Sequence, residues 1–126
     1  MTRPVHFEIH ASDPAALAEF YAKAFDWKVN HIPQMNYWLL DTGLGDGING
    51  GLMKRHGPKP APGQSVNAFV LSLDVPSVDE YQRRALDAGA VVALPKMAIP
   101  GVGWQICIRD PDDNILGLHQ RDPAAH

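Results

Sequence analysis

The chain has 126 residues and a mass of 13.8 kDa, which predicts one domain that is large enough to bury a hydrophobic core. Hydrophobic residues make up 45% of the chain and charged residues 20%, as in ordinary globular proteins, and no apolar run approaches the roughly 18 residues of a membrane span. The net charge of −3 and the scattered basic residues disfavour a nucleic-acid partner. Because the first residues also lack a signal-peptide core, we expect a cytoplasmic protein with no membrane partner.

The first half of the chain predicts a strand, a helix and three further strands. Hydrophobic and polar residues alternate over residues 4–11, which is typical of a strand. Asp13 suits the N-cap of a helix and Pro14 its first turn, and apolar residues follow at helical spacing as far as Phe25. Three short strands complete this half: 28–32, 36–42 and 48–54.

The second half repeats this order after a connector. Residues 55–65 contain three prolines and two glycines, which indicate a connector without regular structure. A strand over 66–74 is followed by Ser77 and Glu80, which form the pattern of a capping box. Gly89 suits the position just after a helix. Further strands are predicted at 90–97, 102–110 and 115–120.

The repeated order predicts two βαβββ modules within a single domain of residues 1–126. Module one covers about 4–54, the connector 55–65, and module two about 66–120. One helix in each module covers one face of its strands and leaves the other face open. We therefore expect an α+β fold in which the modules form one curved eight-stranded mixed sheet, with a concave face that binds a ligand.

Three polar residues of the first predicted strand share one face: His6, Glu8 and His10. Successive members lie about 6–7 Å apart along a strand, so that an adjacent pair could chelate a metal ion. The alternatives are that they line a wet cavity and contact a ligand or water, or that they are exposed without a function. Glu8 is a candidate catalytic base if burial raises its pKa, and the two histidines could instead hold it ionised.

Aromatic residues are further candidates for ligand binding. Tyr37 and Trp38 are neighbours on a predicted strand and must face opposite sides, one toward the helix and one toward the cavity. Trp38 and Trp104 are our candidates for ligand contacts, because aromatic side chains offer a large contact area to small molecules. Both could equally be core residues or contacts in a dimer.

These features together resemble the vicinal oxygen chelate superfamily, which includes glyoxalase I, extradiol dioxygenases and the bleomycin- and fosfomycin-resistance proteins. The resemblance spans residues 5 to about 120, and the family's usual Asp-Pro-Asp-Gly-Asn turn here carries Asp113 in place of glycine. The resemblance implies paired βαβββ modules, often in a homodimer. It is carried by 5–9, 13–14, 20–21, 25–27, 50–52, 88–90 and 110–114.

The resemblance also implies where a metal would bind, because metal-dependent members draw ligands from the first and fourth strands of each module. His6 matches the first of these ligands. Ala68 and Gly117 stand at two other ligand positions, and the remaining position falls at 49–51, where there is no carboxylate. A catalytic divalent site normally needs three protein ligands. We therefore expect that the usual metal site is absent and that no cofactor is needed.

A rebuilt site for a divalent metal is the alternative. His119 lies two residues beyond Gly117 and points to the same side of its strand. It could join His6 and either Glu8 or His10 around one ion.

Three functions remain open at this point. The first is a protein that binds a small molecule in the concave cleft without a metal, as the antibiotic-sequestering relatives do. The second is a lyase, isomerase or dioxygenase with a rebuilt metal site, which would polarise adjacent oxygens of a substrate. The third is a non-catalytic protein that uses its open face for assembly.

Overall fold

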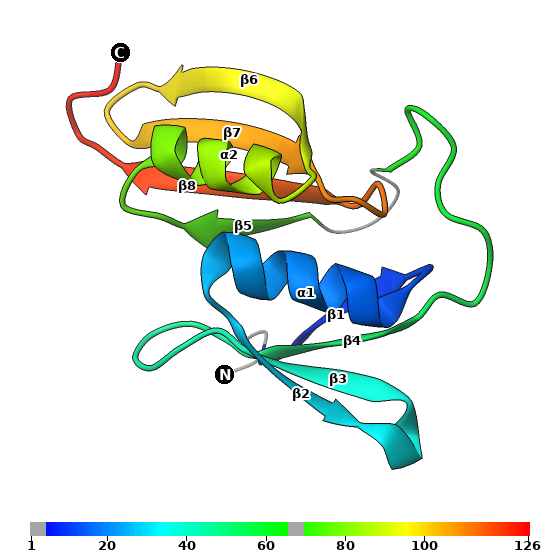
Figure 1. The fold of residues 1–126 in the computed structure, drawn as a ribbon. Helices are drawn as coiled ribbons and strands as arrows, with labels where there is room; N and C mark the ends of the chain where they lie inside the picture. The colour runs from blue at the N-terminus through cyan, green and yellow to red at the C-terminus, as the bar shows by residue number, and fades with distance from the viewer. Residues whose placement is uncertain (1–4, 66–69) are drawn as a thin grey trace. The chain divides into compact units, whose positions relative to one another are not determined.

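The computed structural model describes residues 5–65 and 70–126 and divides the chain into two compact units, Met1–Lys59 and Pro60–His126. Within the described residues, each unit contains one α-helix and one mixed sheet of four strands (Figure 1). The predicted α+β class and the two βαβββ modules are confirmed. Neither described helix has the length and apolar character needed to cross a membrane.

The first unit forms a sheet in the order β1-β4-β3-β2, in which β1 and β4 are parallel and the other pairs are antiparallel. A 3₁₀ turn, η1, was not predicted between β2 and β3. It starts at Pro33, whose ring fixes φ, and ends at Asn36, which adopts the left-handed conformation. The elements are β1 (Phe7–Ala11), α1 (Pro14–Phe25), β2 (Lys28–Ile32), η1 (Pro33–Met35), β3 (Tyr37–Asp41) and β4 (Gly50–Lys54).

Helix α1 begins and ends as its sequence predicts. The Asp13 side chain accepts a hydrogen bond of 3.2 Å from the Ala16 backbone N–H, which caps the first turn. The buried face of α1 packs on the sheet in a mainly aromatic core, in which the rings of Tyr21 and Trp27 stack 5.1 Å apart. The other large buried residues of this core are Phe7, Leu17, Phe20, Phe25, Leu40 and Leu52.

The second unit repeats this topology with an aliphatic core. Its sheet has the order β5-β8-β7-β6, with β5 and β8 parallel. The Ser77 hydroxyl accepts a hydrogen bond of 3.2 Å from Glu80 N–H at the start of α2, and Gly89 follows its end with a φ of +116°. Of the predicted strand 66–74, residues 66–69 lie outside the described residues. The elements are β5 (Leu71–Asp74), α2 (Val78–Asp87), β6 (Val91–Ile99), β7 (Gly103–Arg109) and β8 (Ile115–Arg121).

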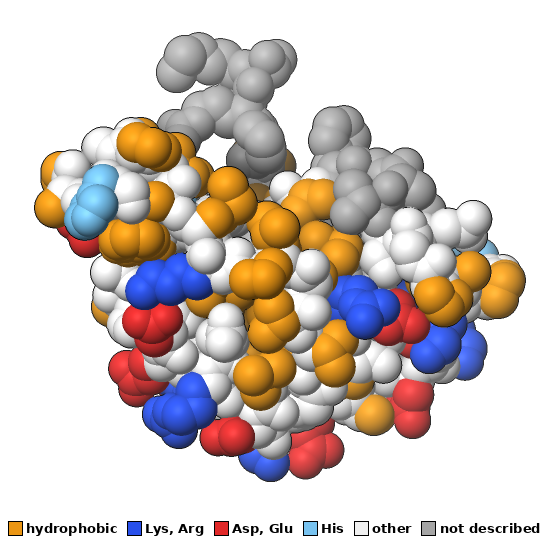
Figure 2. Space-filling view, turned by 90° about the horizontal axis from the view of Figure 1, so that it is seen from above, with side chains coloured by type: hydrophobic (Ala, Val, Ile, Leu, Met, Phe, Trp, Pro, Cys, Tyr) orange, Lys and Arg blue, Asp and Glu red, His pale blue; other side chains and the backbone are white. Residues whose placement is uncertain are grey.

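Each sheet has a helix-covered face and an open face. In the first unit α1 contacts β1, β2 and β4, and in the second α2 contacts β6, β7 and β8. The pairing of the two sheets into one eight-stranded sheet stays a prediction. Hydrophobic side chains are also exposed at the surface, as the orange group that runs down the middle of Figure 2 shows. The edge strand β6 exposes Val91, Val92, Leu94 and Met97.

A glycine on the fourth strand of the first unit shapes its open face. Gly51 pairs with Glu8 on one side and with Leu39 on the other, and a Cβ at Gly51 would overlap the ring and hydroxyl of Tyr37. Tyr37 itself pairs with Met53. Its side chain therefore runs diagonally over the bare backbone of Gly51 to reach Glu8 on β1. We call this passage of a side chain over a strand glycine a crossing.

The second unit contains the same crossing with different side chains. Gly117 pairs with Ser72 and Cys107, and a Cβ there would overlap the Ser72 hydroxyl and lie 2.6 Å from Gln105 Nε2. Gln105 pairs with His119, as Tyr37 pairs with Met53. Ser72, Gly117 and Gln105 are thus the register equivalents of Glu8, Gly51 and Tyr37.

The crossing predicts that Gly51→Ala destabilises the protein. The added methyl group displaces the half-buried Tyr37 ring, and overpacking of this kind costs about 1–3 kcal/mol. Thermal or urea unfolding should show this loss. Gly57→Ala is the matched control, because a Cβ at Gly57 has nothing within 4 Å.

A double variant separates the crossing from a general intolerance of side chains on β4. When Tyr37→Ala is already present, Gly51→Ala should cost less, since the ring it displaces has gone. If Gly51→Ala is as stable as the parent chain, the crossing does not exist as described.

Candidate functional site

The open face of the first sheet carries a hydrogen-bonded group of four side chains centred on Glu8. His10 Nε2 lies 2.8 Å from Glu8 Oε1, and the Tyr37 hydroxyl donates to Glu8 Oε2 over 3.1 Å. His6 Nε2 lies 3.0 Å from the Tyr37 hydroxyl oxygen. We call these four residues the Glu8 network. The structure thus brings together three of the predicted site residues with Tyr37. The sequence had left open whether Tyr37 or Trp38 faces the cavity.

The hydrogen bonds of the network have a defined direction. Because the Tyr37 hydroxyl hydrogen points to Glu8, the hydroxyl oxygen must accept from His6, whose Nε2 therefore carries a hydrogen. Ionised Glu8 is an acceptor only, so His10 Nε2 also carries a hydrogen. Donors from two different strands thus converge on one carboxylate.

The network keeps Glu8 ionised. The hydrogen bond from His10 lowers the pKa of Glu8 below its ordinary value of 4.5; the Tyr37 hydroxyl lowers it further, and partial burial opposes both effects. Burial raises the pKa of Tyr37 above 10.0, and its hydrogen bond to the Glu8 carboxylate raises it further. Of the alternatives that the sequence left open, these contacts favour a Glu8 that His10 and Tyr37 hold ionised. A low pKa makes Glu8 a weak base at neutral pH.

Solutes can reach this face. The side chains of Glu8 and His10 are 40% and 43% exposed. Leu39, which pairs with Gly51, is 40% exposed, and Met53 is half-buried on the same face. The open face therefore combines a fixed polar group with apolar surface beside it, as small-molecule sites do.

His119 lies on the open face of the second sheet, in the crossing described above. Its Nδ1 lies 3.0 Å from Gln105 Oε1, and Gln105 Nε2 donates to the Ser72 hydroxyl over 3.1 Å. With the amide nitrogen as donor, Gln105 Oε1 is the acceptor, so His119 Nδ1 carries the hydrogen. This second group contains no carboxylate, because its members are an imidazole, an amide and a hydroxyl.

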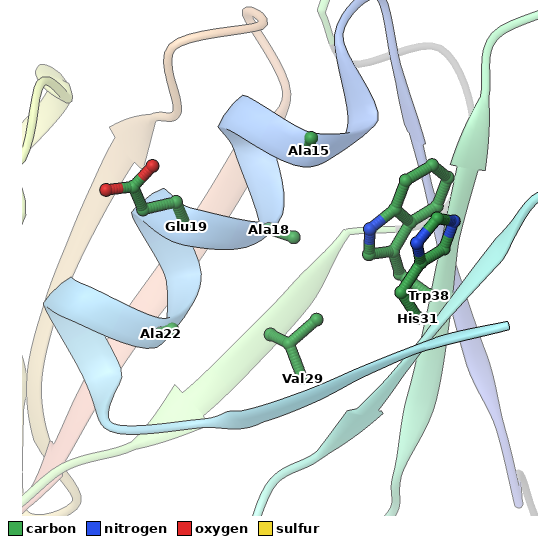
Figure 3. A pocket seen from close by; sticks show the side chains of 7 residues that line it. All are labelled: Ala15, Ala18, Glu19, Ala22, Val29, His31 and Trp38. Carbon is green, nitrogen blue, oxygen red and sulfur yellow. The ribbon is translucent and has the colours of Figure 1, made fainter. Parts of the chain in front are cut away.

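Trp38 and Trp104 lie on the helix-covered faces of their sheets and not with the Glu8 network. The Trp38 indole stacks on the His31 imidazole with centroids 4.1 Å apart and an interplanar angle of 8°. The two rings border a shallow hollow of about 250 Å³ beside α1, and Figure 3 shows them across from the small side chains of the helix. Trp104 donates to Asp122 over 3.0 Å and lies beneath Lys96, which is paired with Asp79 of α2.

Tyr37 and Gln105 were missed as site residues. The alternation of β3 showed that Tyr37 and Trp38 face opposite sides, but it contained no signal for which side each takes. Gly51 and Gly117 were the available signal, since a glycine within a strand often marks the close approach of another group. Their significance depends on register, which only the folded sheet supplies.

The residues present do not fit the family's usual metal set. Any side chain at Gly51 or Gly117 would overlap neighbouring side chains, so neither position has room for a carboxylate. Strand register equates Phe7 with Leu71, and one residue further out His6 corresponds to Val70. Ala68, the position chosen from sequence, lies outside the described residues. Across 5–65 and 70–126, no three His, Cys, Asp or Glu side chains are grouped as a metal site requires. The rebuilt combination of His6 with His119 stays a prediction.

Solved structures share this fold over nearly the whole chain. TioX from Micromonospora sp. ML1 is 19% identical, with a TM-score of 0.72 over 96% of this chain and 100% of TioX. The fosfomycin resistance protein FosX from Listeria monocytogenes is 18% identical, with a TM-score of 0.73 over 97% of this chain and 95% of FosX. A glyoxalase-related enzyme from Fulvimarina pelagi is 17% identical, with a TM-score of 0.72 over 100% and 98% of the two chains. At these identities the likeness shows the fold alone.

No curated protein matches the sequence. The sequence profile of the glyoxalase-like domain, in contrast, matches residues 6–118. This range runs from the first residue of the Glu8 network into β8 and includes both helices. The chain therefore belongs to the glyoxalase-like domain family.

Proposed function

We propose that this protein binds a small molecule on the open face of its first sheet, and that the Glu8 network holds the polar part of that molecule. The supporting observation is that donors from β1 and β3 fix one ionised, partly exposed carboxylate beside the apolar side chains of Leu39 and Met53. Polar groups held in advance lose little freedom when a ligand arrives. The modules act as one domain in this proposal, and the protein is a homodimer.

Binding without a metal is favoured over a metal-dependent lyase, isomerase or dioxygenase. The crossings at Gly51 and Gly117 fill two of the positions from which the family's metal ligands come. Glu8 is best suited to orient a ligand, because its lowered pKa makes it a weak proton acceptor.

The proposal predicts that small-molecule fragments bind this face and that Glu8→Gln weakens their binding about tenfold. The variant retains the side-chain shape but loses the charge, and a hydrogen bond to a charged group contributes about 1.5–3 kcal/mol. Backbone amide shifts in an NMR fragment screen locate the binding face, and titration of one hit gives its dissociation constant. His6→Ala and Tyr37→Phe should weaken the same hit.

Glu19→Gln is the matched control, because Glu19 is an exposed carboxylate on α1 and lies outside the network. If Glu8→Gln and His6→Ala both bind the hit with the affinity of the parent chain, the network is not the binding site. Elemental analysis after dialysis against divalent metals tests the alternative. One tightly held ion that is lost in His6→Ala would support a metal enzyme instead.

The network also predicts a specific pH response. Because the folded pKa of Glu8 is lowered, its stabilising contribution is complete above 4.5 and is lost as the pH falls through the folded pKa. Tyr37→Phe and His10→Ala each remove a hydrogen bond to the carboxylate, so both should raise this pKa toward 4.5. A ¹³C NMR titration of the Glu8 carboxyl carbon measures it directly. Tyr81→Phe, on α2, should leave the curve unchanged, and a Glu8 curve that is identical in all variants would contradict the assigned hydrogen bonds.

A further inference from the structure

The direction of the hydrogen bonds limits which ligands the first face can accept. At the end of the network, His6 donates from Nε2 to Tyr37, so Nδ1 of the neutral ring has a lone pair and no hydrogen. The Tyr37 hydroxyl hydrogen is committed to Glu8. Glu8 accepts at both oxygens and has no hydrogen to give. Within the Glu8 network, this end therefore offers acceptors and no donor.

The surrounding charges do not reverse this preference. Lys28 and Asp41 pair in register at the far side of the sheet. Arg55 donates to the backbone oxygen of His10, and the His56 ring contacts His10 edge-on, so both groups lie at the His10 end of β1. His6 lies at the other end, and the Tyr37 side chain crosses from the register position of His10 to meet it there, beside the Glu8 carboxylate.

We propose that the ligand of this face presents N–H donors, as a protonated amine or an amidine does, to His6 Nδ1 and Glu8, and rests its apolar body on Leu39 and Met53. This inference rests on the proposed function and names the class of molecule that it binds. A carboxylate or phosphate ligand is excluded because it would meet lone pairs where it needs hydrogens. An N–H donor that meets an ionised acceptor forms the stronger, charge-assisted kind of hydrogen bond.

The second unit presents the same kind of atom independently. His119 donates from Nδ1 to Gln105, which leaves Nε2 as the nitrogen without a hydrogen. The two histidines are thus assigned opposite tautomers by their own neighbours. This difference can be measured without any ligand.

Benzamidine and benzoate test the ligand class, because they share one ring and differ in the polarity of the group on it. We expect benzamidine to shift the ring nitrogens of His6 and the amides around Glu8 in ¹⁵N NMR spectra, with benzoate leaving them unchanged. Glu8→Gln should weaken benzamidine about tenfold, and Glu19→Gln should leave its affinity unchanged.

The tautomers supply a second readout. Ring ¹⁵N spectra of the parent chain should show His6 protonated at Nε2 and His119 at Nδ1. Tyr37→Phe should remove the preference at His6 alone, since His119 has a different partner. A His6 ring protonated at Nδ1 in the parent chain would overturn the inference, because its outward atom would then be a donor.

The remaining outcomes separate the inference from the proposed function. If benzoate binds this face and benzamidine does not, the donor class is wrong and the proposed function stands. If neither probe shifts the face, the inference is overturned. If the wider fragment screen also leaves the face unperturbed, the proposed function fails with it.

Discussion

The absence of a side chain at Gly51 is the constraint on which the candidate site depends. Glu8 and Tyr37 stand on strands that are separated by β4, and only a bare backbone between them lets the Tyr37 hydroxyl reach the carboxylate. That contact adds to the larger effect of His10 in lowering the pKa of Glu8, and it fixes the hydrogen on His6 Nε2. A backbone feature at the centre of the sheet thus sets the direction of the hydrogen bonds on its surface.

The second module shows that this crossing is a property of the topology and not of tyrosine. Gln105 passes over Gly117 to Ser72 at the equivalent register positions. The chemistry differs, because an amide and a hydroxyl are neutral where the first module has an ionised carboxylate. Each crossing therefore has the same geometry, and the crossing of the first module has a carboxylate where that of the second has a hydroxyl.

Much of the fold could be predicted from the sequence, because strand alternation, the caps at Asp13 and Ser77 and the repeated order of elements are local signals. The site was harder, because it depends on which residues become neighbours across strands. Alternation placed His6, Glu8 and His10 together. It could not choose between Tyr37 and Trp38, or show that Trp104 faces α2, since a strand of five to seven residues has no preferred side until its sheet is packed. The placement of the counterpart of His6 at Ala68 lies outside the described residues and stays a prediction.

The crossings also change what the fold's usual metal position can do. A divalent metal is an electrophile that attracts the oxygen lone pairs of a substrate. Above Gly51 and Gly117, this chain has side chains from neighbouring strands that form hydrogen bonds with one another. At Gly51 the atoms left for a ligand are the Glu8 carboxylate oxygens and the lone pair of the His6 imidazole. Such atoms attract hydrogens. The same fold thus presents a surface of opposite polarity, and a molecule suited to it would be poorly suited to a metal-bearing relative.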